Sequence, residues 1–401
     1  MTLAMTPHPL IDGPLSKAPM IKGWCPGALR PMASGDGLVV RVRPPIAMLT
    51  QVQAAGLADL AQAQGTGVLQ LTSRANLQIR GVAEAGLATL QDGLMALGLL
   101  DAALDPQMEA RLNILVAPGW SGEDTPALWI ALRQALTAPD APELPGKFGF
   151  ALDVADAVRL QDASADIRIE RAQGRLLVRA DGAPLGRATT VAQAVDLVMA
   201  QARWFVASGG LDADGRGRMR DHLARGAVLP PSLAGDTPPD PAGLRLATVG
   251  FDFGLIDAAA LHRLARLAGG PLQLTPWRGV HLPAAPDLAA LRDDPAFLLD
   301  HADPRYRRFA CTGAPGCPQA LGATRGLARH LGLLPPPGKT LHISGCAKGC
   351  AHPGPADLTL TLTISGIAVI PDGRAADPAA RIVAPGSLAA ALKEWTHAAP
   401  L

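Results

Sequence analysis

Residues 311–317 read CTGAPGC, and residues 344–350 read SGCAKGC. These segments contain four of the five cysteines in the chain, spaced as C-x5-C and C-x3-C. Glycine and proline beside the thiols indicate turns, where backbone N–H groups can point at sulfur. Four thiolates in two pairs can bind one metal centre, and the wider gap favours an iron–sulfur cluster over a zinc ion. Zinc and free thiols are the alternatives.

The composition of the chain limits the partners it can have. Its 401 residues predict two or three domains, and a net charge of +1 offers no field to attract nucleic acid or a membrane. One Tyr and six Trp provide few surfaces for base stacking. No apolar run approaches the ~20 residues of a membrane span, and no signal peptide is visible. Cysteines grouped at metal spacing predict a reducing, cytoplasmic location.

Short sequence patterns recur along the chain in the same order. The recurring pairs are LQLT at 69–72 and 272–275, LATLQD at 87–92 with LAALRD at 288–293, and VAPG at 116–119 with GAPG at 313–316. A helix expected at 50–64 has a counterpart at 257–268, with Asp257 as its N-cap. Repeats in a constant order predict an internal duplication of the fold.

The first repeat has the order of a ferredoxin-like half, strand–helix–strand–strand–helix with short links. Valines interleaved with arginines predict the first strand, and leucines at helical spacing predict the helices. The expected elements are strands at 34–44, 67–72 and 77–80 and helices at 50–64 and 84–98. A longer α/β segment follows, beginning with a strand at 111–117.

These patterns predict an α+β fold in which two ferredoxin-like half-domains and two α/β domains surround a central cleft. The expected divisions are a first half-domain at 21–105, an α/β domain without a cluster at 106–226, a proline-rich linker at 227–242, a second half-domain at 243–298, and a cluster-binding α/β domain at 299–401. The four grouped cysteines lie in the second α/β segment and have no counterparts in the first, so the cluster would form one wall of the cleft.

Basic residues lie beside the strands of both repeats. The candidates for binding a ligand are Arg74, Arg80, Arg111, Lys147 and Arg278. Arginine binds carboxylate with two parallel hydrogen bonds, so this set predicts a ligand that carries several carboxylates. Solvated charges and surface ion pairs are the alternative interpretation.

Five segments together resemble the sulfite and nitrite reductase family over nearly the whole chain. They are LTSRANLQIRG, RLNILVAPG, LPGKFG, CTGAPGCPQA and SGCAKGCAHP. In that family four cysteines hold a [4Fe–4S] cluster beside a sirohaem whose carboxylates contact Arg and Lys. The resemblance implies that the cluster ligands are Cys311, Cys317, Cys346 and Cys350. It also implies that Arg74, Arg111 and Lys147 bind a macrocycle.

Two positions depart from the reductases. Those enzymes usually carry a second lysine in an L-P-x-K-F-K segment, where this chain has Gly149. They commonly have Asn between the last two cysteines, where this chain has Lys348. Loss of the lysine counts against reduction of sulfite or nitrite, which needs fixed cations to bind the anion and supply protons. GWCPGALRPM and HISGCAKGCAHP are more similar to the precorrin-3B synthase branch of the family.

That branch acts in aerobic cobalamin (vitamin B12) biosynthesis. The resemblance implies that a tetrapyrrole, precorrin-3A, is the substrate rather than a cofactor. The implied monooxygenase reaction uses O₂ and reducing equivalents to hydroxylate C20, while an acetate side chain closes a γ-lactone. One alternative is a sulfite or nitrite reductase that contains sirohaem. Another is a cluster protein without enzymatic activity, such as an electron carrier or sensor.

Oxygen insertion calls for a second centre, and the family resemblance implies a mononuclear non-haem iron. His342 and His352 flank the last cysteine pair and are weak candidates for its ligands; hydrogen bonding near the cluster is the alternative. Lys348 is a third weak catalytic candidate, able to contact a substrate carboxylate or to face solvent. The role of Cys25 is open. No Gly-rich dinucleotide fingerprint follows a strand, so a reductase that uses NADH is expected to donate electrons.

Overall fold

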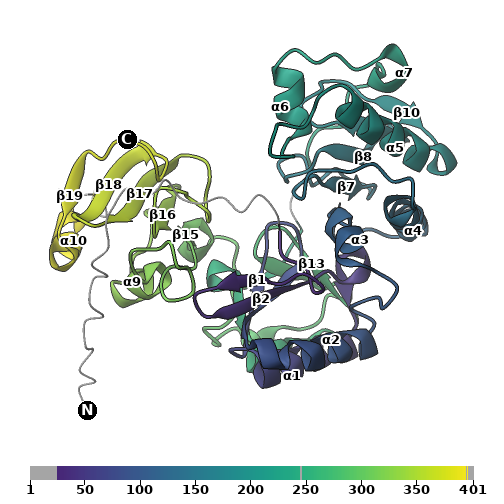
Figure 1. Ribbon diagram of the computed structural model, residues 1–401. Coiled ribbons are helices and arrows are strands. Elements are labelled where there is room, and N and C mark those ends of the chain that lie inside the picture. The colour runs from purple at the N-terminus through teal and green to yellow at the C-terminus, as the bar shows by residue number, and fades with distance from the viewer. Residues whose placement is uncertain (1–24, 244–245, 394, 396–401) are drawn as a thin grey trace. The chain divides into compact units, whose positions relative to one another are not determined.

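A computed structural model describes residues 25–243, 246–393 and 395. The chain forms two compact units (Figure 1). Within the described residues, the larger unit contains 25–33 and most of 38–299, and the smaller unit contains 34–37 and the chain from 300 onward. The cysteine-rich segments belong to the smaller unit, and each unit is considered separately below.

Two ferredoxin-like halves form the base of the larger unit and exchange strands. One sheet has the order β1-β2-β5-β4-β12, formed by Met32–Ser34, Gly37–Val42, Leu77–Val82, Val68–Leu71 and Leu255–Asp257. The other has the order β11-β14-β13-β3, formed by Val249–Gly250, Gly279–His281, Leu272–Leu274 and Met48–Leu49. Strand β12 of the second repeat pairs with β4, and β3 of the first repeat pairs with β13. Each sheet is therefore completed by the other repeat.

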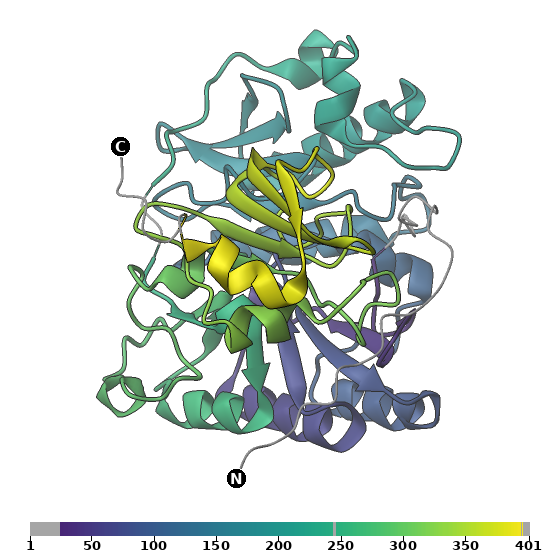
Figure 2. The same cartoon turned by 90° about the vertical axis from the view of Figure 1, so that its left-hand side faces the viewer.

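Corresponding helices begin after these exchanged strands. Helix α1 (Gln51–Gln64) has Thr50 in a capping box with Gln53, and α8 (Ala258–Leu267) is capped by Asp257, which accepts a bond from the Ala260 N–H. The two helices pack together: the Gln51 side-chain amide donates to the Ala265 carbonyl at 2.7 Å. Figure 2 shows the helices of both halves in one row below the strands, with α2 (Leu87–Ala96) beside them.

Two further sheets share one topology. In the larger unit the order is β10-β9-β8-β7-β6, formed by Arg187–Thr189, Arg175–Ala180, Ile167–Ala172, Phe150–Asp153 and Ile114–Val116. In the smaller unit it is β15-β16-β17-β18-β19, formed by Arg308–Ala310, Leu341–Ser344, Ala356–Thr363, Gly366–Gly373 and Arg381–Val383. In each sheet the first three strands along the chain pair in parallel. The fourth strand pairs antiparallel with the third, and the fifth pairs antiparallel with the fourth. The duplication therefore extends to the α/β segments.

Helices accompany these sheets in both units. Those of the larger unit are α3 (Pro106–Arg111), α4 (Asp124–Thr137), α5 (Val191–Ala207), α6 (Met219–Ala224) and α7 (Pro231–Ala234), and those of the smaller unit are α9 (Thr324–His330) and α10 (Leu388–Ala391). Phe148 and Phe205 pack with ring centroids 4.9 Å apart, joining α5 to the core. Members of the main core cluster run from Ala28 to Phe297, so both repeats contribute to it.

The α+β class and the internal duplication are confirmed. Two expectations about elements were wrong. Arg111 ends a short helix, and strand β6 begins only at Ile114. LAALRD forms a single 3-10 turn at Ala289–Leu291, because Pro286 and Pro295 leave too few residues to offset the cost of starting a helix.

The proposed domain limits and the central cleft stay predictions. The proline-rich segment 227–242 includes α7 and contacts the first α/β domain through bridges from Thr237 to Gly186 and from Ala242 to Val158. Across the described ranges, no helix combines the length and the apolar character needed to cross a bilayer.

Candidate functional site

Two cysteine loops leave neighbouring parallel strands of the smaller unit. Cys311 directly follows β15, and Cys346 comes two residues after β16. Because β15 and β16 are parallel, both loops start at the carboxyl end of these neighbouring strands. The Gly345 N–H donates to Cys311 Sγ at 3.2 Å, so a backbone dipole of the second loop points at a thiol of the first.

Glycines allow the two loops to approach each other. Gly313 has a positive φ of 69°, and a Cβ there would lie 2.6 Å from the Thr324 nitrogen. A Cβ at Gly345 would lie 2.6 Å from Ala320 Cβ. The Leu321 N–H donates to the Gly345 carbonyl at 2.9 Å and joins the loops directly. A side chain at Gly345 would push the second loop away from Ala320 and Cys311, and one at Gly313 would displace the first loop from the start of α9.

The four thiols influence one another electrostatically. Burial raises the pKa of the Cys346 thiol. A hydrogen bond from the Lys348 backbone N–H opposes this rise, and the charges of Cys311 and Cys317 add to it. Burial also raises the pKa of Cys350, with smaller increases from the other three thiols. Ionisation of any one of these thiols therefore opposes ionisation of the others. A cationic metal core would relieve their repulsion, since metal ligation requires deprotonated cysteines.

The residues of the two loops are of the type that an iron–sulfur cluster uses, four thiols with a backbone N–H directed at sulfur. Nowhere in the described parts of the chain do three His, Cys, Asp or Glu side chains gather closely enough to hold a bare metal ion. Zinc would need each sulfur about 2.3 Å from one centre. The Gly345 N–H bond to Cys311 Sγ is of the kind that stabilises an iron–sulfur cluster. The ligand assignment of these four cysteines stays a prediction.

His342 lies on β16 beneath the second cysteine loop. Its ring is fully buried, and neither ring nitrogen has a hydrogen-bond partner. Burial, followed by the neighbouring His352, lowers the pKa of His342 to about 4. The two imidazole rings lie 5.8 Å apart, and His352 also packs on Phe309 at 4.5 Å. The structure thus brings these two catalytic candidates together.

The carboxylate that follows them is engaged elsewhere. Asp357 accepts hydrogen bonds from the Thr340 N–H at 2.9 Å and the Thr340 hydroxyl at 2.7 Å, and it pairs with Lys339 at 3.0 Å. These partners outweigh burial and lower the pKa of Asp357 to about 2. Asp357 therefore joins the starts of β16 and β17. The positive charge of the third candidate, Lys348, partly offsets the rise in the pKa of Cys346 and of Cys350.

A basic group in the larger unit contains two of the predicted ligand-binding residues. Arg74 lies in the turn between β4 and β5, where the Thr72 hydroxyl accepts the Arg74 backbone N–H at 3.2 Å. The Arg74 guanidinium donates to the Lys147 carbonyl at 2.8 Å. Cys25 lies near both cations and near Arg41 on β2. We call Cys25, Arg41, Arg74 and Lys147 the basic thiol site.

The other predicted basic residues lie at separate positions. Arg80 is buried on β5, and Arg111 is the last residue of α3. Arg278 has a φ of 60° in the β13–β14 turn of the second repeat, equivalent to the turn that holds Arg74 in the first. The sequence also places Arg41 among the basic residues beside the strands, although not among the five chosen candidates, and it leaves the role of Cys25 open. For Cys25, the GWCPG motif was the signal that the sequence offered.

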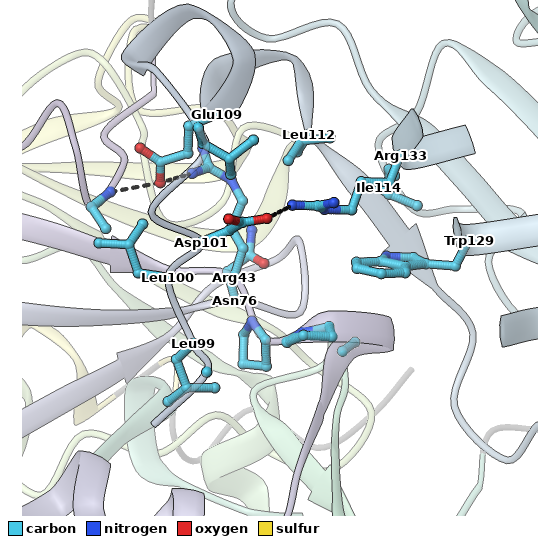
Figure 3. A pocket seen from close by; sticks show the side chains of 16 residues that line it. Arg43, Asn76, Leu99, Leu100, Asp101, Glu109, Leu112, Ile114, Trp129 and Arg133 are labelled. Atoms are coloured by element: carbon cyan, nitrogen blue, oxygen red, sulfur yellow. Dashed lines mark hydrogen bonds and ion pairs between the residues drawn. The ribbon is translucent and has the colours of Figure 1, made fainter. Parts of the chain in front are cut away.

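A pocket of about 360 Å³ lies in the larger unit, and Arg43 and Glu109 are among the residues that line it (Figure 3). Its apolar wall is formed by Leu99, Leu100, Leu104, Leu112, Ile114 and Trp129. Two ion pairs, Arg43 with Glu109 and Arg133 with Asp101, lie at its polar side. The volume is near the lower end for small-molecule sites, so this pocket alone is small for a tetrapyrrole.

Residues 30–97 match the family model described as the nitrite/sulfite reductase ferredoxin-like half domain. A curated precorrin-3B synthase from Sinorhizobium sp is 29% identical over 400 residues, covering 92% of this chain and 86% of that protein. Among solved structures, the NirA protein of Mycobacterium tuberculosis superposes with a TM-score of 0.63 at 18% identity, covering 88% of this chain and 79% of that one.

The chain is an oxidoreductase with the nitrite/sulfite reductase fold. The resemblance seen in the sequence motifs is therefore confirmed, both to the reductase family and to its precorrin-3B synthase branch. The structural match concerns the fold alone, because sequence identity to NirA is low.

Proposed function

We propose that the chain is a precorrin-3B synthase that hydroxylates precorrin-3A at C20 and closes a γ-lactone with an acetate side chain. The oxygen comes from O₂, and the electrons come from a separate reductase that uses NADH. The 29% identity to a precorrin-3B synthase over almost the full chain is the observation that carries this proposal. A cytoplasmic location belongs to the same proposal.

The basic thiol site supports binding of a polycarboxylate. Arg41 is only 8% exposed, and its Nε and Nη1 atoms have no hydrogen-bond partner. Burying such donors unpaired costs about 1–3 kcal/mol each, which a substrate carboxylate would recover. Burial lowers the pKa of Arg74, with further lowering from Arg218 and Arg41. An anion placed among Arg41, Arg74 and Lys147 would relieve this repulsion.

The position of Gly149 supports a substrate role for the macrocycle rather than anion reduction. A Cβ at this residue would lie 3.1 Å from Arg74 Nη1 and 3.3 Å from the Asn113 carbonyl. A side chain at this position would therefore contact Arg74, whereas glycine supplies no cation beside it. The Gly149 N–H also donates to Asp166 at 2.9 Å, which fixes the backbone at this point.

The residues of the smaller unit fit a role as electron-transfer ligands. Cys311, Cys317, Cys346 and Cys350 would hold a [4Fe–4S] cluster, which supplies single electrons when bound. Their loops fix the thiols through the Gly345 N–H and through close glycine contacts. His342 and His352 are candidates for ligands of a mononuclear iron. Their pairing supports that role, whereas the contacts of Asp357 leave it outside the set.

The decisive experiment follows oxygen into the product. The purified protein is incubated anaerobically with precorrin-3A and reductant, then exposed to ¹⁸O₂, and the product mass is measured. We expect one ¹⁸O atom in the product and no turnover without O₂. An unlabelled product, or none from a protein with its full cluster content, would disprove the proposal.

A sirohaem-dependent sulfite or nitrite reductase is the alternative. Such an enzyme as purified would show the strong visible absorbance of a bound macrocycle and would reduce sulfite or nitrite. We expect neither. Visible absorbance should instead come from the cluster alone.

A further inference from the structure

Cys25 lies where three cations act on its sulfur. Burial alone would raise the pKa of this thiol, but Arg41, Arg74 and Lys147 together lower it, and Arg41 also donates a side-chain hydrogen bond. Arg43 is near enough to interact with Cys25 as well, although Glu109 neutralises it at 2.8 Å. The side chain is only partly buried, so small reagents can reach it. Cationic, accessible surroundings of this kind mark reactive cysteines.

The turn that carries Cys25 is held rigidly. Glu109 accepts the Ala28 N–H at 2.7 Å and the Leu29 N–H at 2.9 Å, and the same carboxylate pairs with Arg43. Arg43 also donates to the Pro26 carbonyl at 3.2 Å. A Cβ at Gly27 would overlap the Glu109 carboxylate, so only glycine allows this approach. The thiol is therefore fixed in position relative to the cations.

Arg41 provides a second and independent feature of the site. Its guanidinium is more than nine-tenths buried, and Nε and Nη1 have no acceptor in the described structure. Buried arginine nitrogens usually have partners, so these atoms identify a position suited to an anionic oxygen. A thiol that gained an oxygen would place that acceptor beside the same side chain.

We propose that Cys25 is a site of reversible oxidation by hydroperoxide, and that Arg41 stabilises the resulting sulfenate. The thiolate sulfur attacks one peroxide oxygen, an S–O bond forms, and the O–O bond breaks. The departing hydroxide takes the sulfenic acid proton and leaves as water. Sulfur loses two electrons and the peroxide gains them. A thiol reductant then reverses the change through a mixed disulfide.

The test uses the reduced full-length protein with its cluster in place. Hydrogen peroxide and dimedone, which traps sulfenic acids, are added together, and labelling of the Cys25 peptide is followed by mass spectrometry. We expect labelling of wild-type Cys25 to be about tenfold faster than in Arg41→Gln, because the variant loses both the cation that favours the thiolate and the donor to the sulfenate. Arg41→Lys, which keeps the charge, should retain most of the rate.

Two further measurements guard against misfolding of the Arg41 variant. Lys147 is exposed, so Lys147→Gln should fold and should slow labelling in the same direction. Arg203→Gln, at an exposed ion pair with Asp140, is the matched control and should react like wild type. In the wild-type protein, alkylation of Cys25 by iodoacetamide should have its midpoint below the pH of about 8.5 expected for a free cysteine. A midpoint at or above that pH, or equal labelling in the Arg41 and Lys147 variants, would overturn the proposal.

Discussion

At the scale of single residues, Cys350 offers the clearest test of the metal centre, because the residue as a whole is the most exposed of the four candidate ligands, even though its sulfur is buried enough to raise the pKa of the thiol. Cys350→Ser should therefore fold normally but lose cluster absorbance, since a serine hydroxyl cannot replace the thiolate that binds iron. Iron and acid-labile sulfide analysis measures the loss. Cys25→Ser is the matched control and should keep the full cluster. Full iron and sulfide in Cys350→Ser would remove this residue from the ligand set.

The cysteine spacing predicted more than the basic residues did. The glycines beside the four thiols predicted turns. The structure places both cysteine segments directly after neighbouring parallel strands, at the same end of these strands. Cys25 and Arg41 could not be paired in this way, because they come from a turn and from a strand interior. Their association depends on Glu109, far along the chain, whose hydrogen bonds position the turn.

At the scale of elements, Asp153 links strand β7 to the loop that follows it. Its carboxylate accepts the Arg159 N–H at 2.7 Å and the Leu160 N–H at 2.6 Å. Burial nevertheless raises the pKa of Asp153 from 3.8 to about 6. The folded state therefore holds the proton more tightly than the unfolded chain. The contribution of Asp153 to the free energy of unfolding is therefore largest below pH 3.8, and it is lost as the pH rises through about 6.

We therefore expect Asp153→Asn to flatten part of the pH dependence of stability. Relative to the variant, the wild-type free energy of unfolding should fall by up to about 3 kcal/mol between pH 4 and pH 7. The amide oxygen can still accept both loop N–H groups. Urea unfolding at several pH values measures the difference, with the exposed Asp140→Asn as control. Parallel pH profiles for wild type and Asp153→Asn would contradict this prediction.

Local signals predicted some elements well and others poorly. The Asp257 cap and the apolar spacing after it located α8 to within a residue at each end. LAALRD repeats a helical sequence, yet the nearby prolines reduce it to one 3-10 turn. A sequence echo reports common descent, whereas a helix also needs enough uninterrupted residues to form.

At the scale of the whole molecule, the exchange of β3 and β12 was beyond sequence reasoning. These strands have two and three residues, too few to show a period, and their partners lie in the other repeat. The echoes predicted two similar halves and gave no sign that each completes the sheet of the other. The exchange joins the halves into one hydrophobic core, whose members come from both.

This shared core predicts that the two halves lose structure together. Leu264 on α8 is fully buried, and Leu264→Ala should lower stability by about 2–5 kcal/mol. Because α8 packs on α1, amide hydrogen exchange in α1 should accelerate as much as in α8. Leu360→Ala on β17, equally buried in the smaller unit, is the control and should leave exchange in α1 unchanged. If α1 in Leu264→Ala kept the wild-type rate of amide exchange while exchange in α8 became faster, the exchanged strands would not couple the two repeats.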